Sequence, residues 1–167
     1  MSSTTINNVI AFAGRVMCAA NNGTCHFLVG WIKRDTPTPL TDLAFDNNSA
    51  LVFTNANKGT LGAFPKKSRS LCALKSPPPS LGKPLTVGDT FALTLDTHRR
   101  TSSFYRSTPE SGSELINQGI VFTDIIDAES LVPAFLTCTQ GIVIDCLDCV
   151  LFTNTASEES PIMMVVT

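Results

Sequence analysis

The stretch Gly88–Arg106, GDTFALTLDTHRRTSSFYR, contains two short runs that flank a charged turn. In the first run Phe91, Leu93 and Leu95 fall on one side of an extended chain, and smaller or polar residues fall on the other. This period is that of a half-buried strand. The second run, Thr101–Arg106, is rich in Thr, Phe and Tyr, which suit a pleated surface. The stretch therefore predicts a β-hairpin.

The turn of this hairpin brings together the residue types of a catalytic triad. Asp96, His98, Ser102 and Ser103 lie within a few positions of one another. In a working triad the base and the nucleophile converge in a cleft, and a third group orients the base. Adjacent residues on a turn splay apart instead. We therefore interpret the segment as a solvated turn with a histidine and two arginines, and we expect no catalytic residue here.

Composition limits the other classes of function. A chain of 167 residues with 43% hydrophobic content can bury one substantial core, which favours a single domain over residues 1–167 that can also be part of a larger protein. The formal charge of −2 lacks the basic excess expected of a nucleic-acid-binding protein. No apolar run reaches the roughly 18 to 20 residues that span a bilayer, and the start of the chain lacks the layout of a signal peptide. We expect a cytoplasmic or otherwise intracellular protein without a membrane or nucleic-acid partner.

The six cysteines are expected to be reduced, most of them as small core residues. Cys146 and Cys149 form a C-x-x-C pair that could offer two thiolates to zinc, but a structural site needs four ligands and no second pair exists. On one continuous strand their sulfurs would also face opposite sides. Asp145 and Asp148 are too few for a calcium shell. We predict no metal and no cofactor.

The rest of the chain repeats the pattern of short apolar runs bounded by turn residues. This spacing predicts an all-β fold of two antiparallel sheets packed as a jelly-roll-like β-sandwich, with very little helix. Ser113–Gln118 could form a turn of helix inside a loop. The runs besides the hairpin are Val9–Val16, Cys25–Lys33, Ala50–Thr54, Gly119–Phe122, Leu131–Thr137, Ile142–Cys146, Val150–Phe152 and Ile162–Val166.

The order of several motifs is informative. A V-G-W strand leads through a loop to an aromatic strand, a G-D pair opens a strand that ends in L-D, a hairpin returns through S-F, and a later strand contains P-A. These motifs are His26–Lys33, Ala44–Phe53, Val87–Asp89, Leu95–Asp96, Ser103–Tyr105 and Leu131–Ala134. In this order and spacing they resemble the SPRY domain family over roughly Phe27 to Ile144. Thr97 and His98 stand where that family often has a tyrosine and an acidic residue.

Local chemistry assigns architectural roles to the same motifs. Gly88 and Asp89 are turn formers, and Asp96 can accept hydrogen bonds from backbone donors as the chain turns. Trp31 is expected on the inner face, where its indole N–H needs a partner. The resemblance implies two facing sheets and recognition of a protein or peptide by loops at one edge, with no chemistry, as the targeting part of a larger assembly.

We therefore expect a non-catalytic protein-protein interaction module. Binding residues can vary on loops without disturbing a rigid core, and Arg and Tyr dominate interface energetics when desolvated. The alternatives are a lectin-like carbohydrate-binding module, for which one Trp and one Tyr offer few rings, and a hydrolase, for which the paired acids of a glycosidase strand are absent. The partner and the oligomeric state stay open. The candidate contact residues, each of which could also be ordinary solvated surface, are Arg34, Lys66, Lys67, Arg69, Arg99, Arg100, Tyr105 and Arg106.

Overall fold

A computed structural model describes residues 4–6, 8–18, 27–35, 49–55, 60–64, 72–74, 85–107, 112, 114–137, 143–147, 149–152 and 163–166. Apart from turns, these residues form strands and one turn of 3-10 helix, η1 (Ala128–Ser130). This confirms the predicted all-β class with very little helix. The strands are β1 (Thr4–Ile6), β2 (Val9–Cys18), β3 (Phe27–Lys33), β4 (Ser49–Asn55), β5 (Thr60–Phe64), β6 (Ala73–Leu74), β7 (Thr90–Asp96), β8 (Thr101–Ser107), β9 (Glu114–Thr123), β10 (Leu131–Thr137), β11 (Val143–Leu147), β12 (Cys149–Phe152) and β13 (Met163–Val166).

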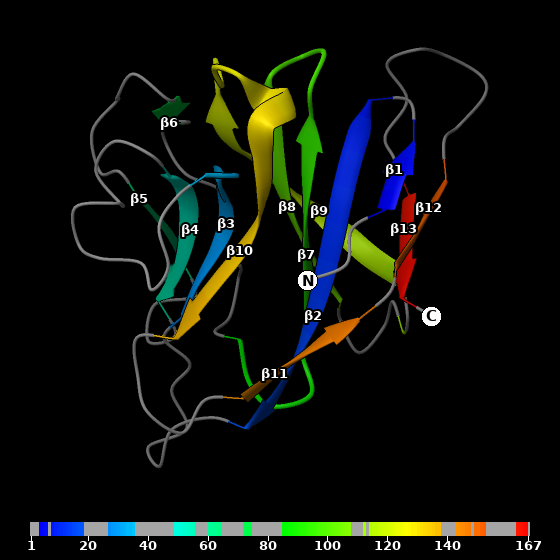
Figure 1. The fold of residues 1–167 in the computed structure, drawn as a ribbon. Coiled ribbons are helices and arrows are strands. Elements are labelled where there is room, and N and C mark those ends of the chain that lie inside the picture. Colours follow the sequence, from blue (N-terminus) through cyan, green and yellow to red (C-terminus); the bar gives the residue numbers. More distant parts are fainter. Residues whose placement is uncertain are drawn as a thin grey trace.

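The strands form two antiparallel sheets that face each other. The larger sheet has the order β1-β2-β7-β8-β9-β13-β12, with β11 added to β2 and β6 added to β9. The smaller sheet has the order β10-β3-β4-β5. In Figure 1 the smaller sheet stands opposite β2, β7 and β8 of the larger one. This arrangement confirms the predicted β-sandwich.

Aromatic side chains fill the space between the sheets. The rings of Phe12 and Trp31 meet edge to face with centroids 5.0 Å apart, and those of Phe91 and Phe104 lie parallel at 6.3 Å. All four are at most 1% exposed. Burial of one such side chain contributes on the order of 1.5–3 kcal/mol, so this cluster is a principal source of stability.

Trp31 also links the two sheets through a polar contact. Its Nε1–H donates to Oγ of Ser102 over 2.9 Å, and both residues are fully buried. Trp31 lies in β3 of the smaller sheet, whereas Ser102 lies in β8 of the larger one. The prediction of a core tryptophan with a partner for its N–H is confirmed. The bond fixes how the two sheets sit on each other at this point.

Strands β7 and β8 form the predicted hairpin, but β7 is not half-buried. From Thr90 to Leu95 every residue is buried, so both faces of the strand are covered. The larger sheet curls so that β12 lies beside β1 and β2. A second apolar cluster lies on the outer face of β7, which is turned away from the smaller sheet. It comprises Ala11, Ala13, Ala92, Tyr105 and Leu115.

Gly14 of β2 illustrates how tightly this region packs. A Cβ atom at this position would lie 2.9 Å from Cζ of Phe91 and 2.9 Å from Cγ2 of Ile144. Phe91 is the register partner of Gly14 in β7, and Ile144 belongs to β11. The absent side chain therefore lets the Phe91 ring and the added strand approach β2 together.

Strand β9 is longer than the sequence indicates. It includes the predicted strand Gly119–Phe122, but Glu114 to Gln118 is also strand, so the helical turn predicted within Ser113–Gln118 is wrong. The register against β8 shifts twice, and Gly119 has φ 125°. These irregularities abolish a clean alternation of buried and exposed residues, which is the signal that identifies a strand from sequence.

Candidate binding surface at one end of the sandwich

The turn between β7 and β8 is organised by Asp96. Its Oδ1 accepts hydrogen bonds from the backbone N–H groups of His98 (3.0 Å) and Arg99 (2.8 Å). The last turn residue, Arg100, has φ 58°. A short carboxylate that bonds the backbone two and three residues ahead stabilises a turn of this kind. The architectural role predicted for Asp96 is confirmed.

These contacts are not those of a triad made of Asp96, His98 and Ser102. Ser102 is fully buried and its Oγ accepts the indole N–H of Trp31, so no substrate can reach it. The Asp96 oxygen is occupied by backbone donors rather than by an imidazole, and His98 is exposed on the turn. Proximity in sequence does not produce convergence in space here.

Backbone hydrogen bonds join this turn to two other segments, and a further bond joins one of these to a third segment. The N–H of Thr97 donates to the carbonyl of Asn8 (3.0 Å), and the N–H of Ile125 donates to that of Arg100 (3.1 Å). On the other sheet, the N–H of Arg34 donates to the carbonyl of Ser130 (3.0 Å). We call the resulting surface the rim. It comprises Asn8, residues 97–100, residues 124–130 and residues 34–35, at the top of Figure 1.

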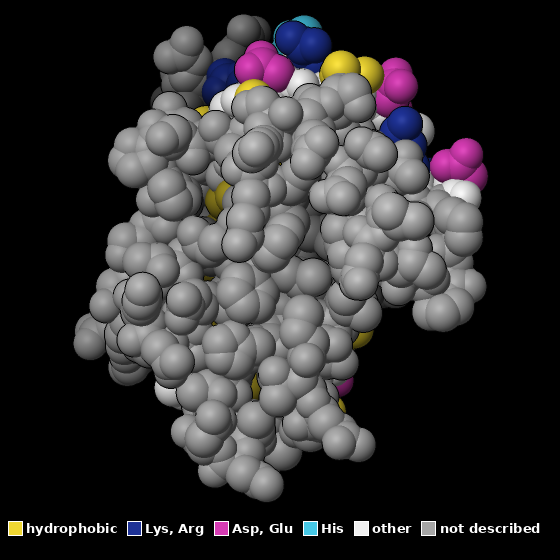
Figure 2. Space-filling view, turned by 90° about the vertical axis from the view of Figure 1, so that its left-hand side faces the viewer, with side chains coloured by type: hydrophobic (Ala, Val, Ile, Leu, Met, Phe, Trp, Pro, Cys, Tyr) yellow, Lys and Arg dark blue, Asp and Glu magenta, His cyan; other side chains and the backbone are white. Residues whose placement is uncertain are grey.

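The rim carries charges of both signs and one large apolar side chain. Figure 2 shows basic, acidic and apolar side chains side by side along the upper edge of the molecule. The rim carries three arginines and four carboxylates, so this surface has little net charge. Besides Asn8 and Ser130, its exposed members are Arg34, His98, Arg99, Arg100, Asp35, Asp124, Asp127, Glu129 and Ile126, the last of which is 47% exposed.

Unusual backbone conformations gather at the rim. Among the described residues other than glycine, those with positive φ are Asn8 (66°), Arg100 (58°), Asp124 (52°) and Asp127 (52°). All four belong to the rim. Asparagine and aspartate tolerate this region better than most residues, whereas for Arg100 it costs about 1–2 kcal/mol. Uncommon backbone conformations gather at binding and catalytic sites, so their concentration marks this end as the candidate functional surface.

Arg100→Gly is expected to stabilise the protein by about 0.5–1 kcal/mol. A left-handed conformation costs a residue with a side chain roughly 1–2 kcal/mol, and glycine avoids this cost. Glycine also makes the unfolded chain more flexible, which cancels part of the gain in stability. Chemical unfolding measures the difference. Arg99→Gly is the matched control, because Arg99 in the same turn lacks a positive φ and its replacement should lose stability. Equal losses of stability for both variants would show that the backbone of Arg100 is not strained.

The structure brings three of the predicted contact residues together. Arg34, Arg99 and Arg100 are exposed at the rim, although they come from opposite sheets. The predicted basic residues Lys66, Lys67 and Arg69 lie outside the residues that the structure describes.

Tyr105 and Arg106 are not loop residues. They lie in β8 and are only 4% and 2% exposed, so their predicted place on an exposed loop surface is wrong. The curl of the larger sheet covers the outer face of β8, to which Tyr105 belongs, whereas Arg106 lies on the inner face beside its register partner Phe91. Tyr105 joins the second apolar cluster, and burial raises the pKa of its hydroxyl.

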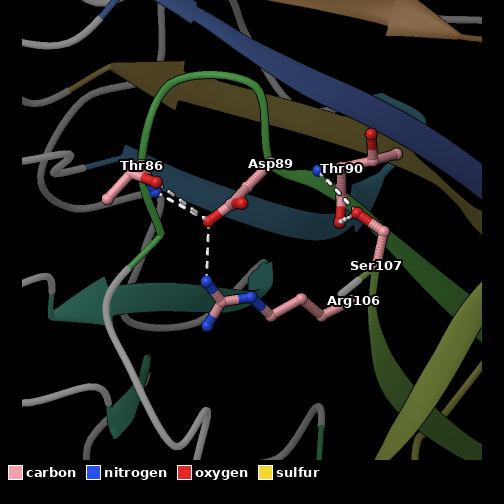
Figure 3. Close-up of polar contacts among 5 residues, drawn as sticks. All are labelled: Thr86, Asp89, Thr90, Arg106 and Ser107. Carbon is pink, nitrogen blue, oxygen red and sulfur yellow. Dashed lines mark hydrogen bonds and ion pairs between the residues drawn. The ribbon is translucent and has the colours of Figure 1, made fainter. Parts of the chain in front are cut away.

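Arg106 binds the turn that precedes β7, at the end of the sandwich opposite the rim (Figure 3). Its Nη2 donates to Oδ2 of Asp89 over 2.6 Å. The same carboxylate oxygen accepts the backbone N–H of Thr86 (2.8 Å), while Gly88 N–H donates to the carbonyl of Val16 (2.7 Å). Gly88 has φ 92°, as a turn glycine can. The turn-forming role predicted for Gly88 and Asp89 is confirmed, and Arg106 is the residue that fixes this turn.

Sequence reasoning missed the acidic part of the rim. Asp124, Ile126 and Asp127 lie on the connection between β9 and β10. The available signal was an apolar pair between two aspartates, since aspartate tolerates the left-handed conformation better than most residues. Its meaning depends on the distant segments beside it, which the sequence does not reveal.

The structure describes the side chains of two cysteines, Cys72 and Cys146. Cys72 is buried in the main core, and burial raises the pKa of its thiol to about 11. Cys146 is exposed. Cys146 and Cys149 also belong to two strands, β11 and β12, rather than to one continuous strand. In the described residues no three His, Cys, Asp or Glu side chains gather as a metal site.

A membrane-spanning helix is likewise not found in the described part of the chain, since none there is both long and apolar enough.

Comparisons with known proteins agree with this architecture. No family model and no curated protein matches the sequence. Among solved structures, the SPRY domain of human HERC1 is similar, with 20% sequence identity and a TM-score of 0.53. The match covers 87% of this chain and 77% of that chain. The chain therefore has the SPRY-like β-sandwich fold that the order of its motifs indicates.

Proposed function

We propose that this chain is a single, non-catalytic interaction domain that binds a protein or peptide partner through the rim. The observation that carries the proposal is the joining of exposed loops from both sheets into one hydrogen-bonded, strained surface. The free thiols of Cys72 and Cys146 support an intracellular setting for this domain.

The rim has the properties of a preorganised interface. A surface whose backbone is already held loses little conformational entropy on binding, and more of the contact energy is then available as affinity. Arg34, Arg99 and Arg100 supply guanidinium groups, which are over-represented among the residues that dominate interface energies. The balance of charges also favours a protein over a polyanion such as nucleic acid.

A lectin-like function receives less support. Sugar sites usually stack the ligand on exposed aromatic rings. The one Trp and one Tyr of the chain, Trp31 and Tyr105, are 0% and 4% exposed. Neither ring can stack on a ligand in this fold.

A photo-crosslinking residue at His98 tests the proposal in cells that make the protein. We expect covalent capture of one specific partner, identified by mass spectrometry. With that partner purified, Arg99→Glu combined with Arg100→Glu should weaken binding by at least about tenfold, because both charges are reversed within the contact surface.

Two charge reversals away from the rim are the control. Glu114→Lys and Asp145→Lys change exposed residues of β9 and β11 and should leave the affinity within about twofold. Circular dichroism checks that every variant stays folded. Capture of no partner at His98, or equal affinity of all variants, would overturn the proposal.

A further inference from the structure

Ile126 is an apolar side chain presented by a fixed turn. It is 47% exposed, whereas Ile125 before it is 0% exposed and Ala128 after it is 2% exposed. Ile125 and Ala128 both belong to the main core. Asp124 and Asp127, on either side of the isoleucine pair, have φ 52°. The chain is thus anchored inward on both sides of Ile126 and directs this residue toward solvent.

Hydrogen bonds hold the turn in this form. Ile125 N–H donates to the carbonyl of Arg100 (3.1 Å), which ties the turn to the β7–β8 hairpin. The carbonyl of Asp127 accepts both the N–H (2.9 Å) and the hydroxyl (2.8 Å) of Ser130. Ile126 therefore has a fixed place on the rim and does not need to be ordered when a partner binds.

Three carboxylates lie close to this apolar residue in the chain. Asp124, Asp127 and Glu129 are all exposed on the same connection, within three residues of Ile126. A rigid apolar residue at the apex of a turn, with charged residues close to it, has the layout of an interface anchor that enters a pocket and is sealed by polar contacts around it. An apolar side chain beside acidic groups is complementary to a partner surface that has an apolar pocket with basic residues at its edge.

We infer that Ile126 is the anchor of the rim and inserts into an apolar pocket on the partner, with Lys or Arg side chains at the pocket edge opposite Asp124 and Asp127. This inference rests on the proposed function. It commits to a folded protein as the partner, because an extended peptide has no pocket of its own to receive a protruding side chain. In this complex the domain supplies the protruding side chain and the partner supplies the pocket.

The chain offers matched controls for this residue. Ile116 and Ile120 are 40% and 39% exposed, close to Ile126, but both lie in β9 outside the rim. Truncation of any of the three removes the same atoms from a similarly exposed position. A difference in binding among the three variants therefore reports on position and not on surface hydrophobicity in general.

The experiment is a calorimetric titration of the full chain with the purified partner captured at His98. Ile126→Ala should raise the Kd at least about tenfold, whereas Ile116→Ala and Ile120→Ala should change it by less than about twofold. Asp124→Lys combined with Asp127→Lys should also weaken binding at least about tenfold, because these charges would face basic groups. Unfolding midpoints should stay unchanged for the three isoleucine variants.

The outcomes separate this inference from the proposed function. Loss of binding on reversal of Arg99 and Arg100 with an unchanged Kd for Ile126→Ala would overturn the anchor and leave the proposed function standing. Equal losses for all three isoleucine variants, or a captured partner whose binding region is a flexible peptide, would also overturn it. Failure to capture any partner at His98 would overturn both.

Discussion

Trp31→Ala should lower the free energy of unfolding by about 3–5 kcal/mol, the range seen when a large aromatic side chain is removed from a core. Trp31 is fully buried, packs against Phe12 at 5.0 Å and bonds Ser102 across the sheets. Its removal leaves a cavity between the sheets and an unpaired hydroxyl. Urea unfolding followed by far-ultraviolet circular dichroism measures the loss without relying on the fluorescence of the residue removed.

Ser102 separates the polar from the apolar part of this effect. Ser102→Ala should cost about 1–3 kcal/mol, since the buried indole N–H then has no acceptor. In a Trp31→Phe background the same change should cost clearly less, because no N–H is left unsatisfied. If Ser102→Ala costs the same in both backgrounds, the hydrogen bond contributes nothing and the prediction fails.

Asp89→Ala is the second large effect that we expect, a loss of about 3 kcal/mol. Arg106 is 2% exposed, and removing the carboxylate leaves its guanidinium buried without that counter-ion. Loss of one member of a buried ion pair costs roughly 3–5 kcal/mol, and the 20% exposure of Asp89 places this case at the lower end. The backbone N–H of Thr86 also loses its acceptor. Thermal and chemical unfolding check the value.

The double variant Asp89→Ala with Arg106→Met is the informative comparison. It removes both charges and keeps most of the buried side-chain volume, so it should be more stable than Asp89→Ala alone. Asp96→Ala, which removes a turn carboxylate at the rim, should cost only about 1 kcal/mol because its partners are exposed backbone donors. If the double variant is less stable than Asp89→Ala, the buried charge of Arg106 is not the cause of the loss and the prediction fails.

Local pattern was sufficient for the strands whose signal is short-range. The second hairpin strand, Thr101–Arg106, and the strand Leu131–Thr137 were predicted to within one residue, because alternation and turn chemistry act among near neighbours. The short strands β1, β5 and β6 were not predicted. In β6 only Ala73 and Leu74 pair with β9, and two residues carry no recognisable period.

Burial of the second sheet face and assembly of the rim depended on long-range structure. The alternation of Phe91 to Leu95 is real, yet the intervening residues are buried as well because the larger sheet curls over them. For the same reason Tyr105 was misplaced on a loop, whereas Arg106 lies on the inner face beside its register partner Phe91 and is paired there with Asp89. At the rim, Arg34 and Ser130 become neighbours only through the pairing of β3 with β10. No local motif encodes that contact.

The pairing of β3 with β10 sets the order of events when the chain is made. Lys33 is paired with Leu131, which leaves the ribosome about 100 residues later, or roughly 5–20 s at ordinary synthesis rates. Until then the β3 edge that carries Trp31 has no strand to pair with on that side. Antiparallel partners so far apart in sequence also slow folding. The smaller sheet can therefore be completed only after β10 emerges, and until then β3 is an open edge with which another chain could pair.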